Sequence, residues 1–173
     1  MSDAPAWADL IRTIPDFPIP GIQFKDITPL LSDGPAFGAV IDAFVERYRD
    51  MGLDAIVGVE SRGFIFGAPV AHRLGIGLVP IRKPGKLPAE TIGVEYALEY
   101  GSNRLELHRD ALKPGARVVL IDDLLATGGT VAAACDLLGQ LGADIAEAAF
   151  VIELAFLEGR AKLACPIFSL ISY

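Results

Sequence analysis

RVVLIDDLLATGGT, residues 117–130, is the stretch that decides the fold of this 173-residue chain. It opens with four apolar residues, 118–121, three of them β-branched, which is typical of a strand buried on both faces of a parallel sheet. Two carboxylates, Asp122 and Asp123, follow at once, and a turn of small and hydroxylated residues then leads into a helix. Because open α/β sheets bind ligands at the carboxyl ends of their strands, the stretch predicts a ligand site.

The turn after the two acids has the composition of a phosphate-binding loop. Gly128 and Gly129 let the backbone aim several N–H groups at one point, and Thr127 and Thr130 add hydroxyl donors. The helix that we expect to begin near Thr130 adds its unpaired N–H groups and its positive dipole end. No Gly-Lys-Ser/Thr ends the loop, so it is not a Walker A motif. The paired carboxylates suit vicinal hydroxyls, and the stretch therefore predicts a site for a sugar that carries a 5-phosphate.

Composition excludes several classes of protein. Hydrophobic residues make up 52% and charged residues 21% of the chain, which excludes disorder and gives a single domain with a real core. No apolar run reaches the roughly 20 residues that span a bilayer, and the N-terminus lacks the basic segment of a signal peptide, so we expect a cytoplasmic protein without membrane contact. The net charge of −7 argues against nucleic-acid binding. Cys135 and Cys165 lack metal-ligand spacing, and we expect them reduced and buried.

Hydrophobic periodicity predicts strands that alternate with helices. Strands are expected at 55–59, 77–81, 118–121, 144–153 and 166–173, and helices at 5–14, 33–51, 63–74, 130–141 and, as a short one, 157–163. This order predicts an α/β fold with right-handed crossovers and a mostly parallel central sheet. Residues 93–108 alternate as a hairpin with its turn at 101–103, which we interpret as a mobile flap.

The N-terminal part reads differently, because three prolines fall between Pro15 and Pro20. Prolines at this density predict an extended, stiff connector and no helix. The segment that follows carries Phe24, which either forms part of a lid over the strand ends or anchors a loop into the core. The residue types alone leave both readings open.

Two further segments carry the chemistry of anion binding. The turn Glu60-Ser61-Arg62 follows the strand at 55–59 and opens a helix, so it offers N–H groups, a hydroxyl and a guanidinium to a second phosphate. The loop after the strand at 77–81 holds three basic residues in five positions, among them Lys83 and Lys86. It is either a solvated loop or a source of positive charge for a pyrophosphate.

With these segments in view, the chain resembles the type I phosphoribosyltransferases, and among them the adenine phosphoribosyltransferases. The resemblance covers Pro15 to Tyr173 and is carried by five motifs in the family's order: FPIPGIQFKDITPLL, VESRGFIFGAPVA, IRKPGKLP, LEYG and VVLIDDLLATGGT. It implies transfer of the phosphoribosyl group of 5-phosphoribosyl 1-pyrophosphate to adenine, giving adenosine monophosphate (AMP) and pyrophosphate, a step of purine salvage.

The resemblance also implies roles for the phosphate-binding and sugar-binding residues. The 5-phosphate would be held by Ala126, Thr127, Gly128, Gly129 and Thr130, and the ribose hydroxyls by the catalytic acids Asp122 and Asp123. The pyrophosphate would be held by Glu60, Ser61, Arg62, Lys83 and Lys86. In this family the peptide between Glu60 and Ser61 is expected to be a non-proline cis bond.

For the base, the resemblance implies a ring bound between Phe24 and Leu124, with its edge read by backbone groups of Gln23 and Lys25. Two of these positions depart from the family's usual residues: Lys25 stands where Arg is common, and Gln23 stands where an aliphatic residue often occurs.

The resemblance assigns the remaining roles as well. On the flap, Glu99 is the candidate for proton transfer at the base, and Tyr100 would close over the phosphoribosyl pyrophosphate. A magnesium ion would be bound mainly through the substrate pyrophosphate, with no direct protein ligand assigned. The chain is expected to form a homodimer of one-domain subunits, 1–173, with a hood at about 1–30 and a flap at about 83–108.

Three alternatives compete with this assignment of function. The substrate could be another base, namely hypoxanthine, guanine, xanthine or orotate, although Phe24 and the LEYG flap favour adenine. A non-catalytic regulator that senses phosphoribosyl pyrophosphate should carry a DNA-binding domain or a basic face, which the net charge of −7 does not favour. A receiver domain also has two acids at a strand end, but ATGGT directly after the acids fits it poorly.

Overall fold

The computed structural model describes residues 5–97 and 102–173 of the chain. The contacts within the chain define two compact units, Met1–Phe44 and Val45–Tyr173. Helix α2 (Gly34–Tyr48) runs from the first unit into the second. No helix of the described part is long and apolar enough to cross a bilayer.

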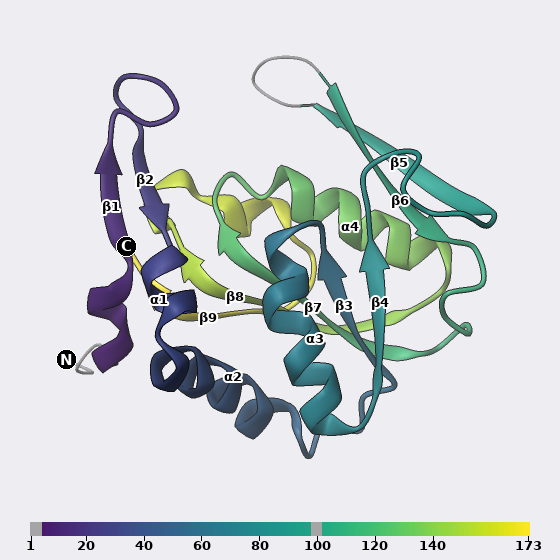
Figure 1. Ribbon diagram of the computed structural model, residues 1–173. Helices are drawn as coiled ribbons and strands as arrows, with labels where there is room; N and C mark the ends of the chain where they lie inside the picture. Colours follow the sequence, from purple (N-terminus) through teal and green to yellow (C-terminus); the bar gives the residue numbers. More distant parts are fainter. Residues whose placement is uncertain (1–4, 98–101) are drawn as a thin grey trace. The chain divides into compact units, whose positions relative to one another are not determined.

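The first unit is built on a short hairpin (Figure 1). The 3-10 helix η1 (Ala6–Leu10) leads into β1 (Arg12–Pro15), which pairs antiparallel with β2 (Gln23–Asp26), and α1 (Thr28–Ser32) follows. The expected helix over 5–14 is therefore wrong beyond Leu10, because cross-strand pairing of Arg12 with Asp26 overrides the helical periodicity.

The proline-rich segment is also different from the expected extended connector. It forms the loop of this hairpin, with a cis bond between Phe17 and Pro18 and positive φ angles at Asp16 (56°) and Gly21 (89°). The Gly21 N–H donates to Asp16 Oδ1 at 2.8 Å and closes the loop. The prolines thus prevent a helix here, as expected, but they lie in a tight loop that reverses the direction of the chain.

The second unit contains the central sheet, and its strands pair in parallel throughout. The strand order is β4-β3-β7-β8-β9, with β3 at Ala55–Val59, β4 at Gly77–Ile81, β7 at Arg117–Leu125, β8 at Asp144–Glu153 and β9 at Ile167–Ser172. The strands coincide closely with the ranges expected from hydrophobic runs, and the expected α/β fold is confirmed.

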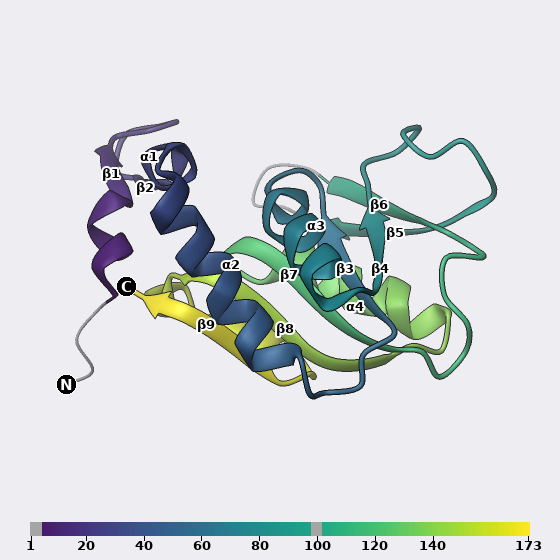
Figure 2. The ribbon, with the colours of Figure 1, turned by 60° about the horizontal axis from the view of Figure 1, so that its bottom comes forward.

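The chain leaves β3 and β7 toward opposite edges of the sheet. From β3 it passes through α3 (Arg62–Leu74) to β4, and from β7 through α4 (Gly129–Gln140) to β8, so right-handed crossovers place the two helices on opposite faces (Figure 2). The boundary between β3 and β7 is a topological switch point, the place where open α/β sheets bind ligands.

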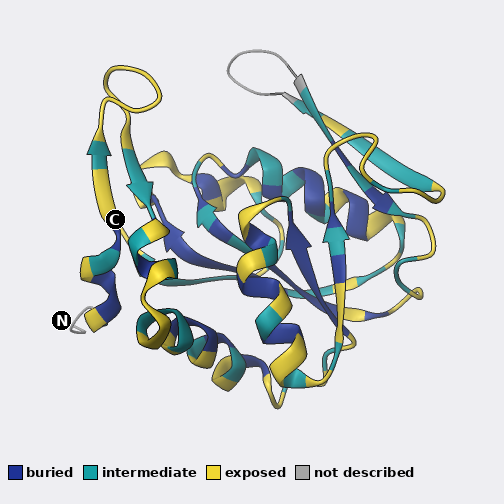
Figure 3. Ribbon diagram, viewed as in Figure 1, coloured by how far each residue is buried: buried dark blue, intermediate teal, exposed yellow. Residues whose placement is uncertain are grey.

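Alternate residues of β3 face the two helices. Gly67 of α3 lies against Ile56 and Gly58, whereas Val57 and Val59 belong to the core that includes α4. The strands β3, β7 and β8 are buried along most of their length (Figure 3), as expected for a sheet covered on both faces.

A second hairpin packs on the α4 side of the sheet. It consists of β5 (Thr91–Ala97) and β6 (Ser102–His108), whose buried residues Leu105 and Leu107 join the same core as α4. Ser102 and Asn103 pair with Ala97 and Tyr96, so they are strand residues and not the turn expected there. Residues 98–101 lie outside the described part.

Between β8 and β9 the chain forms two 3-10 helices, η2 (Ala155–Leu157) and η3 (Gly159–Lys162), where a short helix over 157–163 was expected. The non-glycine residue Glu158 joins them with a φ of 52°. Cys135 and Cys165 are free thiols, as expected, but both are half-buried where full burial was expected, with 3.8 Å between their sulfur atoms.

Candidate active site

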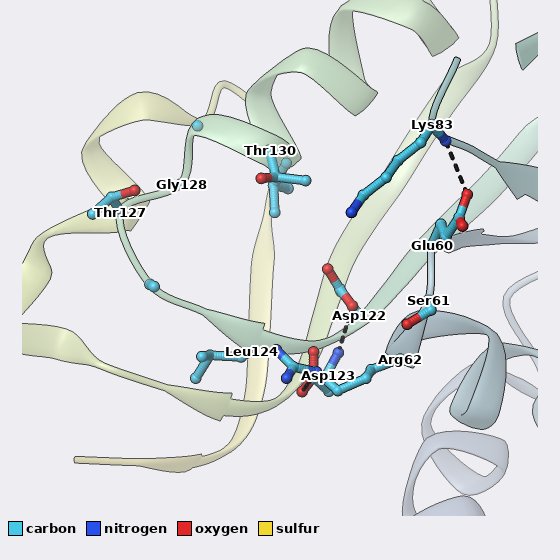
Figure 4. Close-up of a pocket in the computed structure, with 13 residues that line it drawn as sticks. Glu60, Ser61, Arg62, Lys83, Asp122, Asp123, Leu124, Thr127, Gly128 and Thr130 are labelled. Atoms are coloured by element: carbon cyan, nitrogen blue, oxygen red, sulfur yellow. Dashed lines mark hydrogen bonds and ion pairs between the residues drawn. The ribbon is translucent and has the colours of Figure 1, made fainter. Parts of the chain in front are cut away.

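A pocket of about 350 Å³ opens at the carboxyl ends of β3 and β7 (Figure 4). It gathers most of the residues singled out in the sequence. Its lining consists of Glu60, Ser61, Arg62, Lys83, Asp122, Asp123, Leu124, Ala126, Thr127, Gly128, Gly129, Thr130 and Val131. The two turns predicted to bind phosphate therefore share one pocket, since β3 and β7 are neighbours in the sheet.

The loop after β7 curves around one side of the pocket (Figure 4). Gly128 has a φ of 80° and caps α4, which begins at Gly129, one residue before the expected start. No side chain caps this helix end, so its first N–H groups remain for a ligand. These groups and the hydroxyls of Thr127 and Thr130 give this side of the pocket the chemistry of an anion site.

The two acids lie at the end of β7, beneath the pocket. Asp123 is buried, with 4% of its surface exposed, and its Oδ2 forms an ion pair with Arg62 Nε at 2.6 Å. Asp122 is half-buried, and its Oδ1 accepts the Asp123 N–H at 2.9 Å. Burial, reinforced by the neighbouring Asp123 charge, raises the pKa of Asp122 well above its ordinary value. Burial also raises the pKa of Asp123, and the Arg62 guanidinium opposes that rise.

The turn after β3 forms the facing wall. The peptide between Glu60 and Ser61 is a non-proline cis bond, as the resemblance implied. Gly63 follows within α3 and lies so close to β7 that a Cβ there would be 2.6 Å from the Ile121 carbonyl oxygen. The turn is thus held directly against Asp122, at the switch point of the sheet.

Glu60 lines the pocket but directs its carboxylate at the basic loop. Its Oε2 accepts the Lys83 N–H at 2.9 Å and the Arg82 Nε at 3.2 Å, and the Lys83 N–H is the main cause of the lowered pKa of Glu60. Lys83 itself lines the pocket, whereas Lys86 does not; the Lys86 carbonyl accepts from Arg82. Glu60 therefore shapes the loop that carries Lys83.

The residues expected to bind the base are divided between the two units. Leu124 lines the pocket, whereas β2 of the first unit carries Gln23, Phe24 and Lys25. The Phe24 ring stacks edge-to-face on Phe17, with 5.1 Å between centroids. The approach of β2 to the base stays a prediction.

Glu99 and Tyr100, the two flap residues with assigned roles, lie outside the described residues. The described part of the flap nevertheless reaches the pocket lining. The hydroxyl of Thr130 donates to Tyr96 Oη at 3.3 Å, so β5 contacts the loop at 126–130. Tyr96 went unnoticed in the sequence because it fits the apolar alternation of its strand.

Gly159, in the polar stretch after β8, also gave no functional signal in the sequence. In the structure its backbone lies directly against Ala126 and Gly128 of the loop after β7.

The pocket offers oxygen donors that suit a hard divalent cation, namely the carboxylates of Asp122 and Asp123. Among residues 5–97 and 102–173, no group of three or more His, Cys, Asp or Glu side chains is arranged to hold a metal ion. The donor set therefore fits an ion that takes most of its ligands from a bound substrate and from water.

Comparison with known proteins identifies close relatives. The phosphoribosyl transferase domain family matches residues 30–165. The adenine phosphoribosyltransferase of Roseiflexus sp. is 70% identical over 167 residues, which cover 96% of this chain and 97% of that protein. Two crystal structures of adenine phosphoribosyltransferases superpose with a TM-score of 0.92. The Thermoanaerobacter pseudethanolicus enzyme is 53% identical, covering 96% of this chain and 97% of its own. The Saccharomyces cerevisiae enzyme is 44% identical, and the match covers 95% of this chain and 96% of that enzyme. Its structure is a complex with adenine and D-2,5-dideoxy-2,5-imino-altritol 1,6-bisphosphate.

Proposed function

From the premise that this chain belongs to the phosphoribosyl transferase family, we propose how its pocket carries out the reaction of that family. The chain is an enzyme that transfers the 5-phosphoribosyl group of 5-phosphoribosyl 1-pyrophosphate to adenine. The products are AMP and pyrophosphate, and the reaction is a step of purine salvage. The proposals concern the residues that perform it, the metal ion and the assembly.

The observation that carries the assignment of residues is the pairing of two anion sites across the switch point. The turn at Ser61 opens α3 and the loop at 126–128 opens α4, and both line one pocket with the two acids between them. A substrate with a phosphate at one end of a ribose and a pyrophosphate at the other matches this arrangement. The bisphosphate bound with adenine in the yeast relative supports the same division of the pocket.

We assign the 5-phosphate to residues 126–130. Backbone N–H groups at the start of α4 would donate to its oxygens, and Thr127 and Thr130 would add their hydroxyls. Thr130 would exchange its bond with Tyr96 for one with the phosphate, because an anionic acceptor makes the stronger hydrogen bond.

We assign the pyrophosphate to Ser61, Arg62 and Lys83, which lie on the opposite side of the pocket. The Arg62 guanidinium would share its charge between Asp123 and the leaving group. A magnesium ion, held mainly by the substrate pyrophosphate, would supply further positive charge at the leaving group. Lys86 stands three residues beyond Lys83 on the same loop and would act only after that loop moves.

We assign the ribose hydroxyls to the carboxylates of Asp122 and Asp123. When the bond from the anomeric carbon to the pyrophosphate breaks, positive charge develops on the sugar. The carboxylates beneath the ring stabilise that charge, and the cations around the pyrophosphate stabilise the negative charge of the leaving group. Asp122 is half-buried, so water screens its ionised carboxylate less than that of an exposed acid, and the charge acts more strongly on the sugar.

We assign the base to Leu124 on one side and to Phe24 on the other, with backbone groups of Gln23 and Lys25 at its edge. A ring nitrogen of adenine forms the new bond to the anomeric carbon and loses its proton, for which Glu99 is the proposed acceptor. Closure of Tyr100 with the flap would keep water from the activated sugar.

We further propose that the two compact units act as one catalytic domain, with residues 1–30 as a hood and 83–108 as the flap. A homodimer is proposed as the working assembly, since the hydrophobic content of 52% leaves apolar surface for an interface. The partners are small molecules, and neither nucleic acid nor a membrane is expected to be one.

The test is pyrophosphate release from phosphoribosyl pyrophosphate and magnesium in the presence of adenine, hypoxanthine or guanine, each added separately. Release is expected with adenine and at most slow release with the other two bases. Release with guanine but not with adenine would contradict the assigned specificity. Omission of magnesium is expected to abolish release, and full activity after chelation would contradict the proposed metal.

A further inference from the structure

Behind the 5-phosphate loop, the backbone of Gly159 packs directly against the backbone of Ala126 and Gly128. A Cβ on Gly128 would be 2.5 Å from the Gly159 carbonyl oxygen, and a Cβ on Gly159 would overlap the Ala126 carbonyl oxygen. Neither position has room for a methyl group, so each backbone fixes the place of the other.

An ion pair holds Gly159 in place from the next residue. Arg160 donates from Nε to Glu153 Oε1 at 2.5 Å and from Nη2 to Glu153 Oε2 at 2.6 Å, the fork geometry that Arg makes with a carboxylate. Ser169 Oγ donates to the same carboxylate at 2.8 Å, and Arg160 Nη1 donates to the Ile167 carbonyl at 3.1 Å. The network therefore joins η3 to both β8 and β9.

Glu153 is placed at the base of the loop. It is the last residue of β8 and pairs in register with Leu125, the residue directly before Ala126. Its side chain is only 7% exposed, so a carboxylate without Arg160 would be left buried and uncompensated. The adjacent Leu154 N–H donates to the Leu125 carbonyl at 2.9 Å, which ties the two strand ends together.

The backbone that leads to Gly159 needs such support. Glu158, a non-glycine residue, adopts a left-handed conformation with φ 52° and ψ 29°. That conformation is unfavourable for an L-residue and persists where surrounding contacts enforce it. Among the contacts on its C-terminal side are those of Arg160 with Glu153 and Ile167.

We propose that Gly159, braced by the Arg160–Glu153 ion pair, is a positioning element that holds the backbone of residues 126–128 in its phosphate-binding conformation. The inference rests on the proposed function, in which this loop binds the 5-phosphate. The residues concerned touch no substrate, and the effect of losing them is expected to be selective. Loss of the brace weakens ligands of the 5-phosphate loop, whereas ligands of the turn at Ser61 and Arg62, on β3 and α3, are unaffected.

The experiment measures binding of two probes, ribose 5-phosphate and magnesium pyrophosphate, to the full chain by calorimetry. The variants are Gly159→Ala, Arg160→Gln and the conservative Arg160→Lys. Gly159→Ala and Arg160→Gln are expected to raise the Kd for ribose 5-phosphate about tenfold or more, since a displaced loop no longer aims its N–H groups at the phosphate. The Kd for pyrophosphate is expected to stay within about twofold, and Arg160→Lys to recover part of the loss.

A matched control is Arg117→Gln. Arg117 pairs with Asp144 at 3.2 Å, at the ends of β7 and β8 that lie opposite to the loop. The Arg117→Gln change removes an exposed Arg–carboxylate pair far from the loop, and both dissociation constants are expected to match those of the parent chain. A thermal scan of each variant shows whether it folds. If Gly159→Ala does not fold, Arg160→Gln alone tests the proposal.

The outcomes separate the two claims. If the parent chain does not bind ribose 5-phosphate, the proposed function of the loop fails, and this inference fails with it. If the parent chain binds and Arg160→Gln binds equally well, the positioning role alone is refuted. Equal losses for ribose 5-phosphate and pyrophosphate in Arg160→Gln would also refute it, because they would indicate a general loss of structure.

Discussion

Replacing Gly63 with alanine tests whether the contact between α3 and β7 sets the geometry of the active site. A Cβ at Gly63 would be 2.6 Å from the Ile121 carbonyl oxygen and 3.2 Å from Asp122 Oδ1. Ordinary contact begins at 3.4 Å, so the turn and β7 must separate by about 0.8 Å. The obstructing atom is strand backbone, which cannot rotate away as a side chain can.

The expected cost follows from that displacement. Overpacking of this kind destabilises a protein by about 1–3 kcal/mol, which corresponds to a fall in Tm of roughly 3–9 °C for a chain of this size. The same movement carries Ser61 and Arg62 away from the two acids, and kcat/KM should fall roughly tenfold to a hundredfold.

The matched control is Gly67→Ala, one turn later on the same helix. There the two nearest atoms to a Cβ would be side-chain atoms that can adjust, Leu78 Cδ1 at 3.3 Å and Ile56 Cγ2 at 3.5 Å, and the backbone of Gly58 would lie at an ordinary contact distance of 3.7 Å. Alanine in a helix interior gains about 0.5–1 kcal/mol over glycine, so Gly67→Ala should leave Tm unchanged or slightly higher and kcat/KM within about twofold. If Gly63→Ala matches Gly67→Ala in a thermal scan and in steady-state rates, the reasoning is refuted.

Two further perturbations address the acids and the thiols. Changing Asp122 and Asp123 together to asparagine should lower kcat by at least about a hundredfold, because the charge that stabilises the developing cation is lost, while circular dichroism stays native; unchanged turnover would refute their role. The hydrogen bond from Cys135 lowers the pKa of Cys165 from 9.0 to about 7, so alkylation of Cys165 by iodoacetamide should rise with pH through a midpoint near 7. In Cys135→Ala the midpoint should return toward 9, and an unchanged midpoint in that variant would contradict the assigned cause.

Most of the sheet and the centre of the site could be predicted from local sequence. The apolar run at 118–121 and the shorter one at 55–59 became the two central strands, because strands buried on both faces need continuous apolar residues. The turns that follow them share one pocket for a topological reason. Parallel strands that are neighbours end at the same edge of the sheet, so chemistry at two strand ends meets in space.

The errors and omissions arose where distant segments decide the structure. The residues at 12–15 continue a helical pattern, yet Arg12 pairs with Asp26 and makes them a strand. Gly159 falls within the short helix expected at 157–163, and nothing local marks its role, because its neighbour Ala126 lies 33 positions earlier in the chain. Such pairings depend on tertiary contacts that periodicity does not contain.

The charge of the chain illustrates why the global composition says so little about the substrate. A net charge of −7 should repel phosphoribosyl pyrophosphate, yet at physiological ionic strength charges are screened beyond about 8 Å. Within that distance the pocket offers Arg62, Lys83 and the N-terminal ends of two helices. Of its two acids, Asp122 is half-buried and Asp123 is buried and already paired with Arg62. Affinity for the anion therefore depends on the arrangement at the switch point, and the paired acids remain available for the positive charge that appears only when the glycosidic bond breaks.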